Sequence, residues 1–356
     1  MADQPSALAR RRVFLRRGIH FLQRVFSRST VEGVEHIPPR GPALLCFNHL
    51  SILDGPLVVA NVPYDIELVG PGDFPMTPLE EVVVRAYGIT RINRGRADRT
   101  SLRALLAHLR AGRLLAMAPD GGTWEKPILQ AKTGAAYLSQ QTGAPIIPVG
   151  LGGLYEVPVV DVGKLLTRPR ISIRFGEPMP PVPPSADRRQ READLEAVTQ
   201  ELMSRIYALL PPEDQARYDH WARAQYALAI DCAREGTGEP VPYAGPDLPD
   251  MTALAEFIAK PNLFRPMWVN AGLLVDPFRF RRFYAPMEVR LAARDLYRTL
   301  THGAFDVYLH YRLGNEKAAL ALAGIRAIRD ELTEWALGEH VRLRLSPVIS
   351  DPLNPS

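Results

Sequence analysis

The chain has 356 residues, which is long enough to bury a large core and to form two domains. Its composition is that of an ordinary globular protein, and a formal net charge of +4 is too small to identify a class of partner. Two cysteines, Cys46 and Cys232, provide neither a disulfide framework nor a zinc spacing. No apolar run reaches the ~18 residues that span a bilayer, no signal peptide is readable, and we expect a cytoplasmic protein.

The first predicted element is a basic amphipathic helix within residues 1–30. The stretch RRRVFLRRGIHFLQRVFSR contains many arginines and no acid. One apolar stripe at helical spacing comprises Leu15, Ile19, Leu22, Val25 and Phe26. Such a helix can lie in the headgroup region of an anionic membrane. The alternative is a helix docked on its own domain with its arginines facing water. We expect no nucleic-acid partner, because the stretch is nearly half apolar and no binding motif follows.

Residues 31–210 are expected to form one α/β domain, because short apolar runs alternate there with longer stretches of helical pattern. The predicted strands are 43–47, 66–69, 113–118, 146–151 and 171–175. The predicted helices are 52–60, 78–87, 99–111, 129–141 and 187–210. This order predicts a mixed, largely parallel sheet flanked by helices.

The rest of the chain shows no motif that identifies a function. Residues 211–235 are predicted to continue the helical pattern, and the Pro/Gly-rich stretch 236–250 reads as a linker. Residues 251–356 are expected to be a helical extension of unknown role that ends in one short strand. The aromatic side chains near positions 278–284 belong either to the core of this extension or to a second membrane or dimer contact. His302 and His310 have too few neighbouring ligands to predict a metal site.

A histidine and an aspartate follow the first predicted strand of the α/β domain, in ALLCFNHLSILDGPL (43–57). Ligands bind outside the carboxyl ends of the strands in such sheets. Side chains five positions apart do not share a helix face, so His49 and Asp54 can meet only if His49 precedes the helix. Ser51 suits the N-cap and Asp54 the third helical position. The alternative is a plain capping box of Ser51 and Asp54, in which His49 is incidental.

A histidine–carboxylate pair of this kind suits acyl transfer. A hydroxyl is a poor nucleophile, and a histidine that takes its proton supplies general-base catalysis. A carboxylate bonded to the other ring nitrogen fixes the tautomer and stabilises the imidazolium that forms. Backbone N–H groups at the helix N-terminus can also bind oxygen anions.

Further motifs follow this pair in order. Asn48, His49 and Asp54 form Asn-His-x4-Asp, and GITRINR then supplies Gly88 and Arg94. APDGGTW (118–124) and PIIPVGL (145–151) come next. These motifs resemble the four blocks of the glycerolipid (lysophospholipid) acyltransferase family, typified by 1-acyl-glycerol-3-phosphate acyltransferase. The intervening LQAKTGAAYLSQQTGA also resembles this family, including its basic residue at Lys132. The resemblance covers roughly residues 31–210.

The resemblance implies an acyltransferase that moves a fatty acyl group from acyl-CoA or acyl carrier protein to a hydroxyl of a lysoglycerophospholipid. It implies that His49 is the base, that Asp54 orients it and that Arg94 is the main ligand of the acceptor phosphate. No cofactor or metal is implied. The remaining candidate substrate-binding residues are Asn48, Ser51, Gly88, Arg91, Asp120, Gly121, Gly122, Thr123 and Lys132.

The third block departs from the family pattern. Asp120 replaces the usual glutamate, and Gly122-Thr123-Trp124 stands where Thr-Arg-Ser is usual. Arg91 stands in block two where an aromatic residue is usual. The loss of the block-three arginine leaves two alternatives open, an acyltransferase for an alcohol without phosphate, such as a glycolipid, or a catalytically silent membrane-associated lipid-binding protein.

A membrane-resident acceptor implies a protein bound peripherally to the inner face of the cell membrane. The N-terminal helix offers such a contact, with its arginines at anionic lipids and Leu15, Ile19 and Phe26 in the interface. Family members often carry a helical membrane element at this position. The sequence leaves the oligomeric state open.

Overall fold

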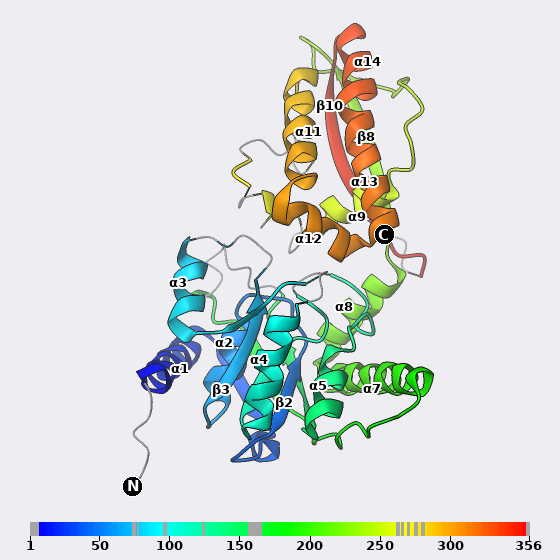
Figure 1. Cartoon of the computed structure of the whole chain (residues 1–356). Helices are drawn as coiled ribbons and strands as arrows, with labels where there is room; N and C mark the ends of the chain where they lie inside the picture. The colour runs from blue at the N-terminus through cyan, green and yellow to red at the C-terminus, as the bar shows by residue number, and fades with distance from the viewer. Residues whose placement is uncertain are drawn as a thin grey trace. The chain divides into compact units, whose positions relative to one another are not determined.

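The computed structural model describes residues 7–72, 76, 78–94, 98–122, 125–155, 166–260, 264, 267–268, 271–273, 277–278 and 282–353, with no side chains for 78–80. The chain divides into two compact units (Figure 1). The N-terminal unit comprises Met1–Gly72 and Thr77–Ala222, and the C-terminal unit comprises Asp73–Met76 and Arg223–Ser356.

The N-terminal unit alternates strands and helices as predicted. Its strands are β1 (Arg28–Glu32), β2 (Ala43–Phe47), β3 (Ile66–Pro71), β4 (Thr90–Ile92), β5 (Leu114–Met117), β6 (Ile146–Gly152) and β7 (Arg170–Phe175). Its helices are α1 (Ala7–Phe26), η1 (Val34–His36), α2 (Asp54–Asn61), α3 (Pro78–Tyr87), α4 (Arg99–Arg110), α5 (Gly134–Thr142), α7 (Arg188–Ala208) and α8 (Pro212–Arg223).

The strands form one sheet of seven in the order β1-β7-β6-β2-β5-β3-β4. Strands β6, β2, β5, β3 and β4 run parallel, whereas β7 is antiparallel to β6 and β1 is parallel to β7. The predicted mixed, largely parallel sheet flanked by helices is thus confirmed. The strands β1 and β4 are short and were not predicted.

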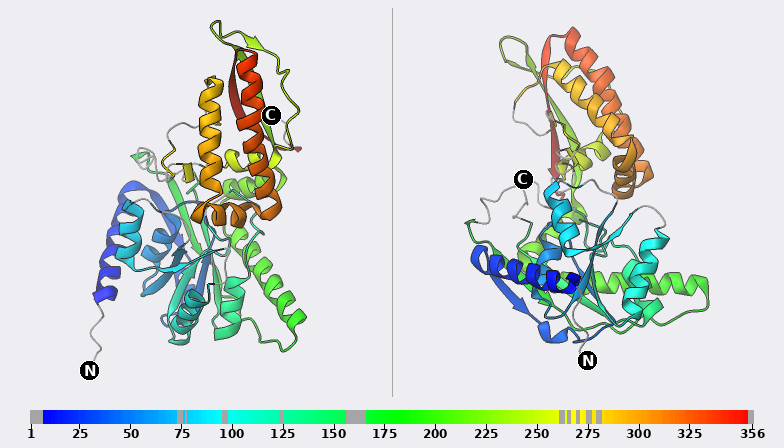
Figure 2. Two further views of the ribbon diagram at one scale, coloured as in Figure 1. Left: turned by 45° about the horizontal axis from the view of Figure 1, so that its top comes forward. Right: turned by 60° about the vertical axis from the view of Figure 1, so that its left-hand side comes forward.

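Strand β2 lies in the middle of the sheet and is buried on both faces, which is why it reads as a continuous apolar run. Alternate side chains enter two separate cores. Leu45 and Phe47 pack in the core that includes α2, whereas Leu44 and Cys46 pack in the core that includes α4, α5 and α7. The helices therefore lie on both faces of the sheet (Figure 2). The carboxyl end of β2 is the point from which the candidate site starts.

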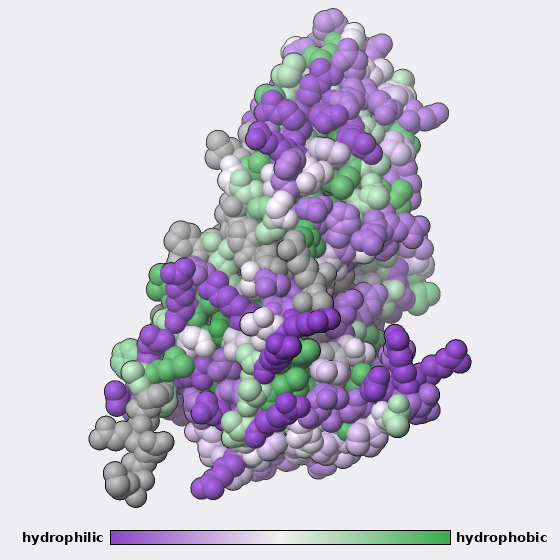
Figure 3. Space-filling model, in the orientation of Figure 1, coloured by the Kyte–Doolittle hydropathy of each residue, from purple (hydrophilic) through white to green (hydrophobic). Residues whose placement is uncertain are grey.

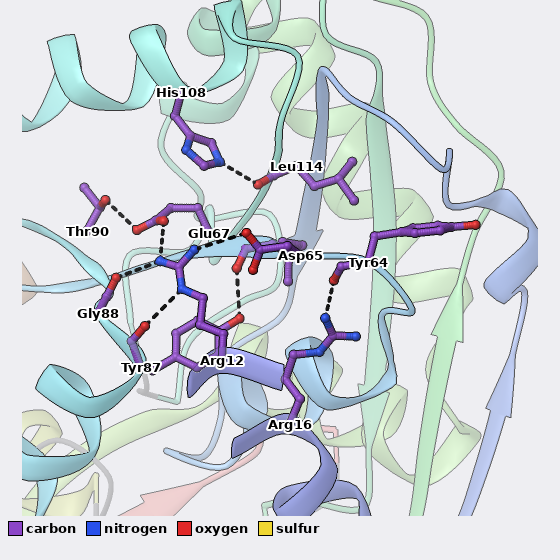
Figure 4. Close-up of polar contacts among 11 residues, drawn as sticks. Arg12, Arg16, Tyr64, Asp65, Glu67, Tyr87, Gly88, Thr90, His108 and Leu114 are labelled. Atoms are coloured by element: carbon purple, nitrogen blue, oxygen red, sulfur yellow. Dashed lines mark hydrogen bonds and ion pairs between the residues drawn. The ribbon is translucent and has the colours of Figure 1, made fainter. Parts of the chain in front are cut away.

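Helix α1 is docked on the N-terminal unit through arginines (Figure 4). Arg12 is buried, forms an ion pair with Glu67 and donates hydrogen bonds to the carbonyls of Tyr87 (3.0 Å) and Gly88 (2.8 Å). The Arg16 guanidinium donates to the carbonyl of Tyr64. The alternative of a helix docked on its own domain is therefore met, except that two of its arginines face the protein and not water.

The predicted apolar stripe of α1 does not face outward as a whole. Leu15 packs against the core of the unit, and Ile19 and Phe26 are half-buried. The outward face instead carries Phe14 and Phe21, which are 76% and 65% exposed, together with Leu22 and Val25. The outward position predicted for Leu15 was wrong, because the stretch is apolar on both sides and tertiary contacts decided which side packs.

Two predicted helices begin later than expected. Helix α2 begins at Asp54 and not at position 52, and α5 begins at Gly134 and not at position 129. Residues 129–132 are instead held in turns, because the N–H of Lys132 donates to the carbonyl of Pro119 (2.9 Å).

The C-terminal unit has helices packed around a small antiparallel sheet. Its strands are β8 (Gln225–Arg234), β9 (Pro240–Val241) and β10 (Val341–Ser350), in the order β10-β8-β9. Its helices are α9 (Thr252–Ala259), α11 (Pro286–Leu300), α12 (Gly303–Leu313), α13 (Asn315–Ala327), η2 (Ile328–Leu332) and α14 (Thr333–Gly338).

The helix predicted over 211–235 is wrong beyond Arg223, because residues 225–234 form β8. This strand pairs with β10 along its full length, from Arg234 opposite Val341 to Gln225 opposite Ser350. The predicted linker 236–250 contains β9, and the predicted short terminal strand is ten residues long. The two partners are more than a hundred residues apart in sequence, so local patterns could not reveal their pairing.

The aromatic stretch near positions 278–284 supplies core side chains. Phe278 and Tyr284 are buried, and Phe278 packs edge-on against Phe264. Arg282 lies over the Tyr284 ring. The residues at 279–281 lie outside the described part of the chain.

Candidate active site

His49 lies in the loop between β2 and α2, and its ring meets Asp54. The His49 Nδ1 and Asp54 Oδ2 atoms are 2.8 Å apart. The His49 side chain is 23% exposed, whereas that of Asp54 is 1% exposed. Within the described residues Nε2 of His49 makes no hydrogen bond. The pair therefore has a buried carboxylate on one side and an accessible ring on the other.

The Asp54 carboxylate also holds the loop that carries His49. Its Oδ2 atom accepts hydrogen bonds from the backbone N–H groups of Leu50 and Ser51, the latter at 2.7 Å. Burial raises the pKa of the Asp54 carboxyl, and the hydrogen bonds from His49, Ser51 and Leu50 oppose that rise. The carboxylate thus acts on His49 through the ring and through the backbone.

The alternative of a plain capping box of Ser51 and Asp54 is only half met. Asp54 is the first residue of α2, its N-cap residue is Leu53, and no side chain caps that position. Ser51 lies in the loop, where its hydroxyl accepts from the N–H of Leu53 (3.3 Å). The box is incomplete because the Ser51 hydroxyl accepts from Leu53 and not from the N–H of Asp54, although the Asp54 carboxylate does accept from the N–H of Ser51.

Asn48 fastens the same loop to the neighbouring strand. Its amide nitrogen donates to the carbonyl of Leu151 (2.9 Å), and its amide oxygen accepts from the N–H of Leu151 (2.8 Å). Leu151 is in β6, which pairs with β2. The first and fourth sequence blocks are joined by this contact.

Asp120 joins the third block to the first. It is buried in the turn after β5, and its Oδ2 atom accepts a hydrogen bond from the backbone N–H of His49 (2.9 Å). The buried ammonium of Lys126 donates to the backbone carbonyls of Asp120 and Gln130. Lys126 was not predicted, because no local pattern distinguishes a buried lysine from the exposed lysines of other loops.

Arg94 joins the second block to the third. Its guanidinium donates to the carbonyl of Gly121 (2.8 Å). Gly121 and Gly122 have φ values of +78° and +128°, a region that side-chain-bearing residues rarely adopt. The tight turn therefore requires glycine at both positions, and it brings the Gly121 carbonyl beside the half-buried guanidinium of Arg94.

The structure does not bring Gly88 and Arg91 to this site. Gly88 has φ +72° and directs its carbonyl to Arg12 of α1. The Arg91 guanidinium pairs with the Glu81 carboxylate at 2.8 Å. The Gly88 carbonyl thus helps to hold α1 on the unit, and the Arg91 side chain is bound to Glu81 of α3.

The remaining candidates are Lys132 and Thr123. The Lys132 side chain is exposed, and its backbone N–H closes the turn onto Pro119. Thr123 lies outside the described residues. The described part of the chain holds no cluster of three or more His, Cys, Asp or Glu side chains that could bind a metal ion.

Comparison with known families gives one match in this region. The family model described as Acyltransferase matches residues 28–152, which contain β1 to β6 and all four blocks. Residues 28–152 form an acyltransferase-family domain. The predicted resemblance to an acyltransferase family is confirmed over these residues, which form the acyltransferase domain of the enzyme.

Comparison with curated proteins and with solved structures covers the chain as a whole. No curated protein matches the chain. Among solved structures, the 1-acyl-sn-glycerophosphate (LPA) acyltransferase PlsC from Thermotoga maritima is similar, with a TM-score of 0.40 and 22% sequence identity. The match covers 58% of this chain and 84% of that one.

Proposed function

We propose that this acyltransferase moves a fatty acyl group from acyl-CoA or acyl carrier protein to a hydroxyl of a lysoglycerophospholipid. The observation that carries the proposal is the 2.8 Å contact between His49 Nδ1 and the buried Asp54 carboxylate. A proton on Nδ1 is held by that carboxylate, which leaves the lone pair on Nε2. The arrangement is the one that general-base catalysis needs.

The reaction uses His49 twice. Nε2 takes the proton of the acceptor hydroxyl while its oxygen attacks the thioester carbonyl, and Asp54 stabilises the resulting imidazolium. The tetrahedral intermediate then collapses, the carbon–sulfur bond breaks, and the thiolate takes the proton back from Nε2. The products are the new ester and the free thiol, and no covalent enzyme intermediate is required.

Arg94 is the proposed ligand of the acceptor phosphate. Its guanidinium lies against the Gly121 carbonyl, in the turn that also carries Asp120. A planar guanidinium can bond two phosphate oxygens at once. Arg91 is a weaker candidate because it is already paired with Glu81.

The second candidate acceptor is a neutral alcohol. In the sequence of the third block Thr123 stands where the family has an arginine, and Arg91 of the second block is paired with a carboxylate. Both features reduce the positive charge available to a phosphate, which favours an acceptor such as a glycolipid.

The protein is proposed to reach its acceptor at the inner face of the cell membrane through the outward face of α1. Phe14, Phe21, Leu22 and Val25 are exposed there, and the exposed arginines of the same helix include Arg10, Arg17 and Arg24. In Figure 3, hydrophobic and hydrophilic side chains lie next to one another in the region where Figure 1 draws α1 and α3. No helix in the described residues has the length and apolar character of a membrane span.

The test is thioester consumption with a panel of acceptors. Wild-type protein is expected to release free thiol from acyl-CoA or acyl carrier protein when 1-acyl-glycerol-3-phosphate is present. His49→Ala is expected to lose at least ~99% of this turnover. His302→Ala, which changes an exposed histidine of the C-terminal unit, is the matched control and should retain it. A folded His49→Ala protein with wild-type turnover would contradict the mechanism, and turnover only on alcohols without phosphate would select the second candidate.

A further inference from the structure

Helix α8 lies beyond the residues that match the family model, yet it packs against the loop that carries His49. Tyr218 of this helix is buried together with Leu50, which directly follows His49. Leu210 belongs to the same cluster, and the ring of Trp221 meets the Tyr218 ring edge-on at 5.1 Å. The loop between β2 and α2 is therefore covered by a segment that the four blocks do not include.

The Tyr218 hydroxyl lies at the loop itself. It is buried beside the Asn48 amide, near the side chains of Asp120 and Asp54, and makes no hydrogen bond within the described residues. Burial raises the pKa of Tyr218 well above its ordinary value, the charge of Asp120 raises it further, and the Asn48 amide opposes the rise. The hydroxyl therefore keeps its proton and stays a neutral dipole near the carboxylates that hold His49.

Helix α8 is fixed to the end of β6. The buried Asp214 carboxylate accepts a hydrogen bond from the backbone N–H of Gly153 (2.8 Å), directly after that strand. The Gln215 amide donates to the carbonyl of Leu210 (3.2 Å), which ties α8 to the end of α7. Because Asn48 is bonded to Leu151 of β6, the catalytic loop is held from the strand and from the helix at once.

We propose that Tyr218 is a positioning residue of the acyl-transfer site. Its ring belongs to the same buried cluster as Leu50 and its hydroxyl lies beside the Asn48 amide, so the side chain restrains the two residues that flank His49. This inference rests on the proposed role of His49 as the base. A base must be held within a fraction of an ångström of the proton it removes, and a misplacement of ~1 Å can lower the rate by about a hundredfold.

The first test compares Tyr218→Phe with Tyr207→Phe in the full-length protein. Tyr207 belongs to the same aromatic cluster, but its hydroxyl bonds the exposed Asp219. Tyr218→Phe removes only the buried hydroxyl beside Asn48 and is expected to lower kcat about three- to tenfold through a small displacement of His49, with the KM values for donor and acceptor nearly unchanged. Tyr207→Phe should keep the wild-type kcat. Trp221→Phe, which retains the whole Tyr218 side chain, should also keep it, and an equal fall in that variant would assign the effect to the aromatic cluster in general and overturn the specific role of Tyr218.

The second test needs no activity. The backbone N–H groups of His49, Leu50 and Ser51 all donate to carboxylates of the site. Hydrogen exchange at these amides should be faster in Tyr218→Phe than in wild type and in Tyr207→Phe, while exchange elsewhere stays the same. Unchanged exchange in a folded Tyr218→Phe protein would overturn the positioning role. Absence of thiol release by wild type on every acceptor would instead count against the proposed function, and the exchange result would still decide the role of Tyr218.

Discussion

The backbone N–H of His49 donates to the side chain of Asp120, which is 71 residues away in the sequence. This bond fixes the main chain of His49, while Asp54 fixes its ring. Two carboxylates on different elements thus set the position of one imidazole. Asp120 stands where the family has a glutamate, and its observed contact is with the catalytic loop.

Asp120→Ala is expected to lower kcat about ten- to hundredfold, because a bond to a charged acceptor contributes about 1.5–3 kcal/mol. Asp120→Asn should lose less, since its amide oxygen can still accept from the His49 N–H. Steady-state kinetics of the two variants at saturating donor measures the difference. If alanine changes only the acceptor KM, Asp120 contacts the acceptor and does not position His49.

Asp54→Asn should separate activity from stability. The variant removes the charge that stabilises the imidazolium, and kcat is expected to fall by about 10²–10⁴-fold. Because burial raises the pKa of Asp54, the folded protein binds that proton more tightly than the unfolded chain does. The contribution of Asp54 to the free energy of unfolding therefore falls as the pH rises from 3.8, the ordinary pKa of the carboxyl, through its raised pKa in the folded protein.

The Tm of Asp54→Asn minus the Tm of wild type should accordingly be larger at pH 8 than at pH 4, because the variant lacks the buried charge that destabilises wild type at high pH. Thermal unfolding followed by circular dichroism at both pH values measures it. A Tm difference that is independent of pH, or that becomes less favourable at pH 8, would show that the folded protein does not raise the pKa of this carboxyl.

Arg94 decides whether the acceptor carries a phosphate. Arg94→Lys should raise the acceptor KM, and Arg94→Ala should lower the acceptor kcat/KM ten- to hundredfold, because bidentate charge-assisted bonds are lost. The donor KM should move little. Arg91→Ala is the matched control, since Arg91 is paired with Glu81, and we expect a much smaller effect. Equal acceptor KM values in all variants would favour the neutral-alcohol alternative.

Phe14→Ser/Phe21→Ser should weaken binding to vesicles that contain anionic phospholipid by at least about tenfold, because each buried phenylalanine contributes roughly 1.5–3 kcal/mol. Co-sedimentation at ~0.15 M salt measures it. Val348→Ser/Ile349→Ser removes two exposed apolar side chains of β10 and should leave binding unchanged. Equal binding by both double variants would exclude the α1 face as the membrane contact.

Arg12→Met is expected to lower the free energy of unfolding by about 3–5 kcal/mol, because it leaves the Glu67 carboxylate buried without its cation. Arg10→Met changes an exposed arginine of the same helix and should have little effect. Denaturant unfolding compares the two. Adding Glu67→Gln to Arg12→Met should recover part of the loss, and no recovery would show that the pair is not the cause.

Deleting α1 would remove the Arg12–Glu67 pair and destabilise the protein in the same way, so point substitutions in α1 are the cleaner test of membrane binding.

The sequence alone determined the features that depend on neighbouring residues. The apolar run at 43–47 is β2 as predicted, because a strand buried on both faces needs no polar alternation. The placement of His49 before a helix and Asp54 in its first turn followed from local patterns, and the structure brings their side chains together. The order of the four blocks was sufficient to indicate the family.

Only the tertiary structure decided which distant residues meet. Several contacts join segments that lie far apart in the chain. They are the hydrogen bond from His49 to Asp120, the burial of Lys126 and Arg12, the cluster of Tyr218 with Leu50 and the pairing of β8 with β10. Periodicity shows that a side chain is apolar or charged, but a contact depends on the register and packing of whole elements. For the same reason the sequence could not show which side of α1 faces outward, because that side depends on the contacts that Arg12 and Arg16 make with the rest of the unit.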